Sequence, residues 1–218
     1  MDLPQAAASA FAGSVSIEVF ADVCCPFTHV GLRRLVERRE QLGQERPLLI
    51  RAWPLELVNG EPLDALVIAE EVEALRAEVA PDLFAGFDPA AFPRSSMPAL
   101  ALTASAYALR VEVGERVALA LRWALFEEGR DIAAPDVLLD IAVSAGIGLP
   151  EHREQDRVRE DLAEGQRRGV IGSPHFFVGS SSYFCPGLQI EKVDGRLRVA
   201  GGGAALESFI ADAFPVSA

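Results

Sequence analysis

Apolar and polar side chains alternate over residues 15–20, which predicts a β-strand with one apolar face. From Pro26 the spacing changes, and apolar residues recur every three or four positions opposite a charged face. This periodicity predicts a helix over residues 26–41, and Gly43 marks its end. A largely apolar run at 47–53 predicts a second strand. A strand, a helix and a strand at this spacing form a βαβ unit with two parallel strands.

From about residue 60 to residue 148 the chain has helical spacing and no strand pattern, so we interpret this region as an all-helical insertion. A buried strand follows at 170–178, with Pro174 near its head. The other predicted elements are helices at 66–79, 99–113, 115–128, 135–144, 150–168 and 204–214, and short strands at 183–190 and 197–200 joined by a turn at Asp194–Gly195.

The formal net charge is -12 and the sequence pI is about 4.7. Nucleic acids and anionic membranes both require a basic protein face, so this charge argues against either partner. No apolar run is long enough to span a membrane. Residues 1–13 lack the features of a secretory signal, so we expect a flexible tail and a cytoplasmic protein. Three cysteines and three histidines favour neither a disulfide framework nor a structural zinc site, and we expect no metal.

Cys25 stands where the first predicted strand passes into the first predicted helix. Pro26 falls in the first helical turn, where a missing N–H costs nothing. The free N–H groups and the positive dipole end of a helix start stabilise an anion, and the thiolate is the reactive form of cysteine. The sequence therefore predicts a reactive thiol with a lowered pKa at Cys25.

Three neighbours of Cys25 leave alternatives open. Asp22 is either a proton acceptor for thiol exchange or a cap of the following turn. Cys24 is expected to be a buried core thiol, because a disulfide between adjacent cysteines is strained. His29 either favours the thiolate as an imidazolium or is a surface residue of the helix.

The sequence resembles the DsbA family of thioredoxin-fold proteins, and most closely its cytoplasmic FrnE-like branch. The segments that carry the resemblance are Glu18–Phe27 with Gly31, Ala124–Ile132, Asp161–Val170 and Gly172–Val178. The resemblance implies an α/β protein with a thioredoxin-like fold. Its thioredoxin-like domain would comprise residues 14–59 and 149–218, interrupted by an all-helical subdomain at 60–148.

The resemblance also implies roles for individual residues. Cys25 would be the nucleophilic cysteine, and Pro174 the cis-proline that faces it. Ser173 would offer backbone groups to an extended substrate, and the helical insertion would cap the thiol and shape a substrate groove. The substrate-binding residues implied are Pro26, Phe27, Ser173, Pro174 and His175.

The sequence departs from the family pattern after Cys25. Dithiol members carry Cys-Pro-x-Cys, whereas this chain has Thr28 at the position of the second cysteine. A hydroxyl cannot resolve a mixed disulfide, but it can donate to the thiolate. Cys185 lies just after the cis-proline strand and is the better resolving candidate within the chain. The alternatives for Cys185 are a redox partner of Cys25 and an inert buried thiol.

Three functions therefore stay open. The favoured one is a thiol–disulfide oxidoreductase, acting on a disulfide-containing protein or a small-molecule thiol substrate, with Cys185 or an external thiol resolving. The second is an isomerase or transferase of the hydroxychromene-carboxylate isomerase or kappa-like type, which would use glutathione, mycothiol or a similar low-molecular-weight thiol as co-substrate. The third is a non-catalytic thioredoxin-fold binding module. No other cofactor is expected, and nothing in the pattern indicates an oligomeric state.

Overall fold

The computed structural model describes residues 17–150 and 152–215, so the tail expected over residues 1–13 lies outside the described residues. The strands are β1 (Ile17–Ala21), β2 (Leu48–Ala52), β3 (His175–Val178), β4 (Ser181–Phe184), β5 (Leu188–Val193) and β6 (Arg196–Gly201). The helices are α1 (Pro26–Gln41), α2 (Leu55–Asn59), α3 (Ala65–Glu78), α4 (Met97–Leu109), α5 (Val111–Phe126), α6 (Pro135–Ala145), α7 (His152–Arg167) and α8 (Gly203–Ala213), with a short 3-10 helix at Pro89–Ala91.

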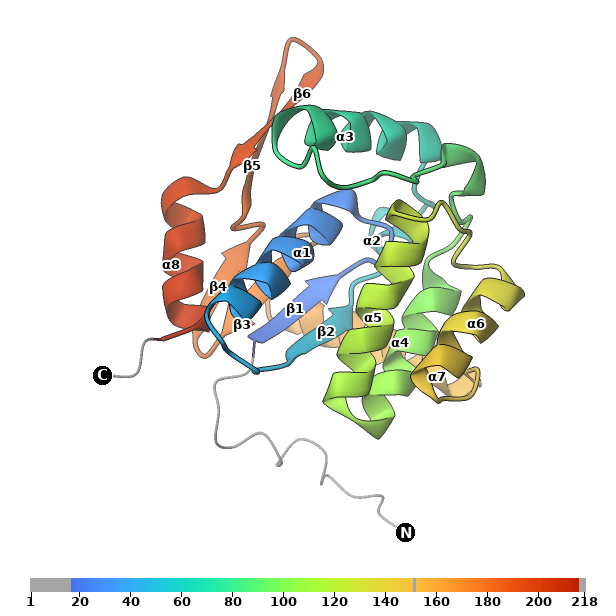
Figure 1. Ribbon diagram of the computed structural model, residues 1–218. Helices are drawn as coiled ribbons and strands as arrows, with labels where there is room; N and C mark the ends of the chain where they lie inside the picture. Colours follow the sequence, from blue (N-terminus) through green and yellow to red (C-terminus); the bar gives the residue numbers. More distant parts are fainter. Residues whose placement is uncertain (1–16, 151, 216–218) are drawn as a thin grey trace.

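A four-stranded sheet lies at the centre of the molecule, in the order β2-β1-β3-β4 (Figure 1). β1 runs parallel to β2, as the strand–helix–strand pattern predicts, and Val19 lies opposite Ile50. β3 runs antiparallel to β1, so that Phe176 lies on the other side of Val19. β4 continues the sheet as a short antiparallel edge strand. The end of β1 is thus held between two neighbours, which fixes the position of the loop that leads to Cys25.

Different helices cover the two faces of this sheet. Val19 of β1 belongs to an apolar core that it shares with Leu32 of α1 and Phe209 of α8. The next residue, Phe20, points to the opposite face and packs edge-on against Trp53. α7 covers this second face. Alternation along β1 therefore serves both layers: Val19 lies on the apolar α1 and α8 side, and Phe20 lies on the α7 side together with Glu18, which pairs with Arg51.

Helices α3 to α6 follow β2 in the chain and share a large apolar core with the start of α1. α4 and α5 pack along each other, and α3 crosses over the N-terminal end of α1 (Figure 1). The regular elements between residues 60 and 148 are thus all helices, as the sequence predicts. Its proposed boundaries at residues 60 and 148 stay a prediction.

The last two strands form a separate hairpin, which projects beyond the sheet and leans on α3 (Figure 1). Asp194 and Gly195 both have positive φ, 50° and 77°, as a two-residue hairpin turn requires, and they stand where the sequence predicts the turn. Glu78 at the end of α3 accepts a hydrogen bond from the Val199 amide (2.6 Å) and pairs with Arg198 (3.1 Å). The hairpin is therefore fastened to α3, which packs against α1.

The outer edge of β2 is closed by side chains from the surrounding helices. The amides of Leu48, Ile50 and Ala52 donate to Glu115 Oε2 (2.7 Å), Tyr107 Oη (2.9 Å) and Asp161 Oδ2 (3.0 Å), respectively. The Tyr107 hydroxyl in turn donates to the Leu48 carbonyl (2.8 Å). An unpaired strand edge that is buried needs such partners, because a buried amide without one is costly.

Replacing Tyr107 with phenylalanine is expected to lower the free energy of unfolding by about 1–3 kcal/mol, because the Ile50 amide and the Leu48 carbonyl lose their shared partner. The measurement is urea unfolding followed by far-UV circular dichroism. Tyr183→Phe is the matched control, because its hydroxyl contacts Asp212 on the surface, and a change of less than about 0.5 kcal/mol is expected there. Equal losses in both variants would contradict the role of Tyr107 at the edge.

Two predicted strands are shorter than the sequence pattern indicates. The strand expected over 170–178 begins only at His175, because the cis bond at Ser173–Pro174 turns the chain just before it. The strand expected over 183–190 is interrupted between Phe184 and Leu188, where Cys185 has φ 44°. A left-handed residue cannot continue a strand, so the chain leaves the sheet at Cys185.

Candidate active site

Cys25 caps the N-terminus of α1, and Pro26 follows as its first residue, as the sequence predicts. The residue is 4% exposed, and its thiol donates a hydrogen bond to the main-chain carbonyl of Ser173 (Sγ to O, 3.2 Å). The peptide bond between Ser173 and Pro174 is cis. The fold thus brings Cys25 to the bend at Pro174, although 148 residues separate Cys25 from Ser173 in the sequence.

The Ser173 hydroxyl joins the loop before α1 to the loop before β3. It accepts a hydrogen bond from the Asp22 amide (2.9 Å) and lies 2.8 Å from the Thr28 hydroxyl. Thr28 is fully buried. Thr28 therefore occupies the position of the missing second thiol and holds the cis-proline loop against α1.

The pKa of the Cys25 thiol is raised, which contradicts the lowered pKa that its place at a helix start predicts. Burial is the largest cause, since it disfavours the charged thiolate. Hydrogen bonds from Thr28 and Ser173 oppose the rise, and the negative charge of Glu71 adds to it. In this arrangement the thiol is protonated and donates to the Ser173 carbonyl. The stabilisation that the helix start gives to a thiolate is smaller than the cost of burying its charge.

Asp22 is fully buried, and hydrogen-bond donors occupy its carboxylate. Oδ1 accepts from the Cys24 amide (2.8 Å), and Oδ2 accepts from the Leu55 amide (2.7 Å) and the Ser96 hydroxyl (3.0 Å). Burial raises its pKa, and these hydrogen bonds oppose the rise. Of the two alternatives, the structure supports the capping one: Asp22 shapes the turn before Cys25, and its carboxylate is engaged elsewhere than at the thiol.

The other two cysteines differ in their relation to the site, and all three cysteines are free thiols. Cys24 is a buried core residue, as expected. The Cys185 amide donates to the Pro174 carbonyl (3.0 Å), which places this thiol beside the cis-proline. Burial and the nearby charge of Cys25 raise the pKa of Cys185 to about 12. The two thiols therefore share one neighbourhood without a bond between them.

A groove of about 480 Å³ runs from the cis-proline along α1. Phe27 at the start of α1, Pro174, Cys185 and Phe209 of α8 are among its lining residues. Its walls are α1, the end of the cis-proline loop, the start of β5 and α8. The helical insertion contributes none of the lining residues, which corrects the expectation that the insertion shapes this groove.

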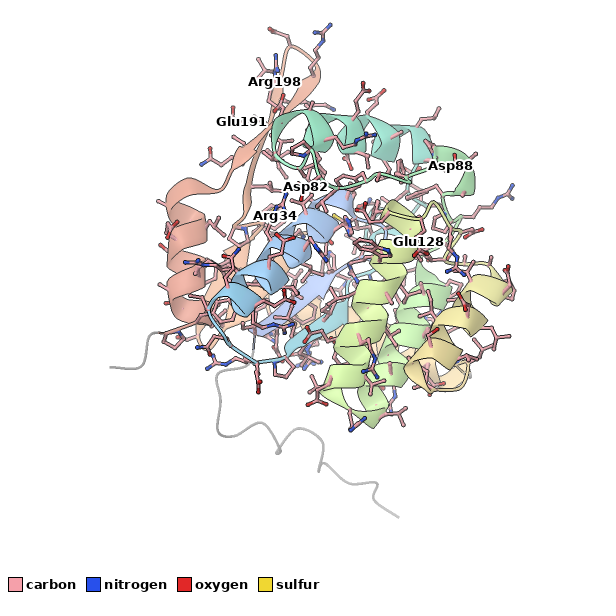
Figure 2. All side chains as sticks on the ribbon, viewed as in Figure 1. Arg34, Asp82, Asp88, Glu128, Glu191 and Arg198 are labelled. Atoms are coloured by element: carbon pink, nitrogen blue, oxygen red, sulfur yellow. The ribbon has the colours of Figure 1, made fainter. Side chains whose placement is uncertain are left out.

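Arg34 stands on the rim of the groove and points toward Asp82, in the loop after α3 (Figure 2). Its Nη1 lies 2.9 Å from Asp82 Oδ2 and 3.0 Å from Glu37 Oε2. These side chains are substantially exposed, so the pairs add little stability. They do orient the guanidinium beside the groove and connect α1 to the insertion.

Residues 16–198 match the family of the DSBA-like thioredoxin domain. The chain belongs to the DSBA-like thioredoxin family. The α/β thioredoxin-like fold with a helical insertion, which the sequence predicts, is thereby confirmed. Assignment to the FrnE-like branch stays a prediction. No match was found among curated proteins.

Solved structures with this fold come from several functional groups. The cytosolic disulfide reductase DsbM of Pseudomonas aeruginosa is 18% identical with a TM-score of 0.58, over 92% of this chain and 93% of that chain, and it has also been solved with GSH. A probable DsbA oxidoreductase of Streptomyces coelicolor is 18% identical with a TM-score of 0.61, over 94% and 92%. A 2-hydroxychromene-2-carboxylate isomerase is 14% identical with a TM-score of 0.60, over 77% and 87%. At these identities the likeness establishes the fold alone.

Among the helices that the structure describes in this DSBA-like chain, none combines the length and apolarity needed to cross a membrane.

The structure does not bring His175 to the DSBA-like groove, which corrects its expected role in substrate binding. Its ring stacks on Phe177 (4.9 Å between centroids), and its Nδ1 accepts from the Ile171 amide (3.2 Å). Side chains alternate along β3, and Phe176 is the neighbour that faces the groove. Strand parity therefore turns His175 to the α7 side of the sheet.

His29 is neither an imidazolium near the thiol nor a surface residue. It is buried between the rings of Phe84 and Phe126, and its Nε2 lies 2.7 Å from Glu127 Oε1. Burial lowers the pKa of the imidazole, and Glu127 opposes that change only in part. His29 is therefore a neutral packing residue that joins α1 of the DSBA-like domain to the end of α5.

Sequence reasoning missed Glu71 of α3, although it follows the spacing of the buried residues Ile68, Val72 and Leu75. Burial raises the pKa of Glu71 to about 7, and the positive charge of Lys192 opposes the rise. When ionised, its carboxylate raises the pKa of the Cys25 thiol in turn.

Glu71→Gln is expected to speed alkylation of Cys25 at pH 8.5 by about two- to tenfold, because a nearby negative charge is removed. At pH 6, Glu71 is mostly protonated, since its pKa is about 7, and the two proteins should react at similar rates. Iodoacetamide labelling with peptide mapping measures this. An equal increase in the alkylation rate of Cys25 at pH 6 and at pH 8.5 would show that the charge of Glu71 is not responsible.

Proposed function

We propose that this protein is a thiol–disulfide oxidoreductase in which Cys25 is the nucleophile. The observation that carries the proposal is the hydrogen bond from the Cys25 thiol to the carbonyl of Ser173, directly before cis-Pro174, because Pro174 and Cys185 both line the adjacent groove. The substrate would be a disulfide-containing protein or a small-molecule disulfide, acting in the cytoplasm as the FrnE-like resemblance implies. No metal or nucleotide enters the reaction.

In the first step the Cys25 thiol loses its proton and the thiolate attacks one sulfur of the substrate disulfide. The S–S bond of the substrate breaks, a mixed disulfide with Cys25 forms, and the other substrate sulfur leaves as a thiolate that takes up a proton. The Ser173 carbonyl, which accepts from the thiol in the closed state, becomes free to pair with an extended substrate. Phe27 and Pro174 would form the walls that hold the substrate.

The second step needs a second thiol, because Thr28 carries no sulfur. Attack by the Cys185 thiolate on the Cys25 sulfur would release the substrate as a thiol and leave a Cys25–Cys185 disulfide. Alternatively, a low-molecular-weight thiol such as glutathione or mycothiol would attack the Cys25 sulfur, release the substrate as a thiol and leave its own mixed disulfide on Cys25. A second molecule of that thiol would then attack this mixed disulfide, which gives the oxidised co-substrate and restores the Cys25 thiol. Burial raises the pKa of Cys185 to about 12, which favours the external thiol unless the groove opens.

The test is turnover of a mixed disulfide of glutathione with a fluorescent thiol, with glutathione as reductant, together with intact-mass analysis of the trapped intermediate. We expect turnover and a glutathione adduct that maps to Cys25. Cys185→Ser separates the two resolving routes, since it abolishes turnover if Cys185 resolves and leaves it intact if glutathione does. Absence of both turnover and adduct in the folded wild-type protein would reject the proposal.

Thr28 favours one second candidate, an isomerase or transferase that uses a bound low-molecular-weight thiol. A hydroxyl at this position cannot form the second half of a dithiol pair, and the groove lined by Phe27, Pro174 and Cys185 has room for a small organic molecule. Saturable glutathione binding without disulfide turnover would favour this reading. Cys25 itself argues for the oxidoreductase, because an isomerase of this kind needs only a hydroxyl to activate the bound thiol.

A further inference from the structure

Arg122 of α5 is among the most deeply buried large side chains of the described residues, with 1% exposed. Its Nη1 donates to the Ala118 carbonyl (2.9 Å) and its Nη2 donates to the Asp22 carbonyl (3.2 Å). Its Nε has no hydrogen-bond partner among the described residues. A buried guanidinium that meets only main-chain carbonyls is costly, because its full charge is desolvated without a direct ion pair.

The Arg122 guanidinium lies close to the backbone of Cys25. The Asp22 carbonyl that accepts from Arg122 also accepts from the Cys25 amide (3.4 Å). One carbonyl oxygen therefore bridges the guanidinium and the backbone of the reacting cysteine. The carboxylate of Asp22 is occupied by its three donors on the other side of the turn, so it does not contact the guanidinium directly.

We propose that Arg122 is a positioning residue whose buried positive charge stabilises the Cys25 thiolate as it forms. This inference rests on the proposed function, since it takes Cys25 as the reacting thiol. Other groups coupled to the charge of Cys25 are negative when ionised: Cys24 of its own loop, Glu71 of α3 and Cys185 after β4. Arg122 is a cation coupled to the same thiol. Burial lowers the pKa of Arg122, and the charges of Asp22 and then Cys25 oppose that change.

The test is the pH dependence of Cys25 alkylation by iodoacetamide, which reports the thiolate and needs no disulfide substrate. Arg122→Met is expected to raise the pKa of Cys25 by at least about one unit, which slows alkylation at pH 8 about tenfold. Arg122→Lys keeps the charge and is expected to stay within about threefold of the wild type. Equal rates in Arg122→Met and the wild type, or equal losses in both variants, would overturn the proposal.

A second variant separates the charge of Arg122 from a general loss of stability. Glu115→Gln is the matched control, because Glu115 is a buried charged residue of the same helix whose partners are Arg39 and the Leu48 amide. It should lower stability and leave the alkylation rate unchanged.

Should Arg122→Met fail to fold, Arg122→Gln replaces it, because it removes the charge and keeps hydrogen-bond donors; an unchanged alkylation rate in that variant overturns the proposal. Should the protein lack both disulfide turnover and a glutathione adduct while alkylation still depends on Arg122, the proposed function is rejected and this inference stands.

Discussion

Replacing Cys25 with serine is expected to abolish disulfide turnover, with a loss of at least about a hundredfold. A serine hydroxyl fits the same space and can donate to the Ser173 carbonyl as the thiol does. It cannot form a disulfide and is not ionised at neutral pH, so the mixed disulfide disappears with it. The measurement is the turnover assay with the glutathione mixed disulfide, followed by intact-mass analysis.

The neighbouring cysteine supplies the control. Cys24 is buried in the core, and burial raises its pKa well above the ordinary value, so Cys24→Ser removes a thiol that takes no part in the proposed reaction. Turnover in Cys24→Ser should stay within a few-fold of the wild type as long as the protein folds. If Cys25→Ser keeps its activity while Cys24→Ser loses it, the nucleophile has been misassigned.

Replacing Asp22 with alanine is expected to lower the free energy of unfolding by about 3–5 kcal/mol. The substitution leaves the Cys24 amide, the Leu55 amide and the Ser96 hydroxyl without their acceptor in a fully buried place. It also removes the largest of the charge effects that oppose the lowering of the Arg122 pKa by burial. Urea unfolding at neutral pH measures the change.

Asp64→Ala is the comparison for this prediction. Asp64 caps α3 on the surface and accepts a single hydrogen bond, from the Leu66 amide (2.7 Å), so its loss should cost about 0.5–2 kcal/mol. If Asp22→Ala lowers the free energy of unfolding no more than Asp64→Ala does, Asp22 is an ordinary cap and its burial adds no stability.

The sequence predicts the order of the elements well, because most of them carry a clear period and clear end signals. α1 has the predicted bounds, since its apolar spacing begins at Pro26 and its charged face continues to Gln41. The short helix Leu55–Asn59 was not predicted, because five residues hold too little periodicity to stand out. The break at Cys185 also escaped prediction, since a positive φ at a non-glycine residue leaves no mark in the pattern.

The candidate site was predictable only in part. Cys25, Ser173 and Pro174 could be placed together through the family resemblance, and the structure joins them. The burial of Arg122 could not be predicted, because an arginine between leucine and tryptophan in an amphipathic helix is typical of a surface position. The raised pKa of Cys25 was missed for a similar reason. A helix start stabilises a thiolate locally, but desolvation depends on helices that are far away in the sequence.

The closed edge of β2 means that the thioredoxin-like sheet depends on the helices that follow it in the chain. Two of the three side chains that satisfy its amides, Tyr107 and Glu115, come from the helices inserted after it. A shortened protein that joined β2 directly to α7 would expose an unpaired strand edge, which favours pairing with a second copy. The helices after β2 thus supply the polar side chains that satisfy the outer edge of the sheet.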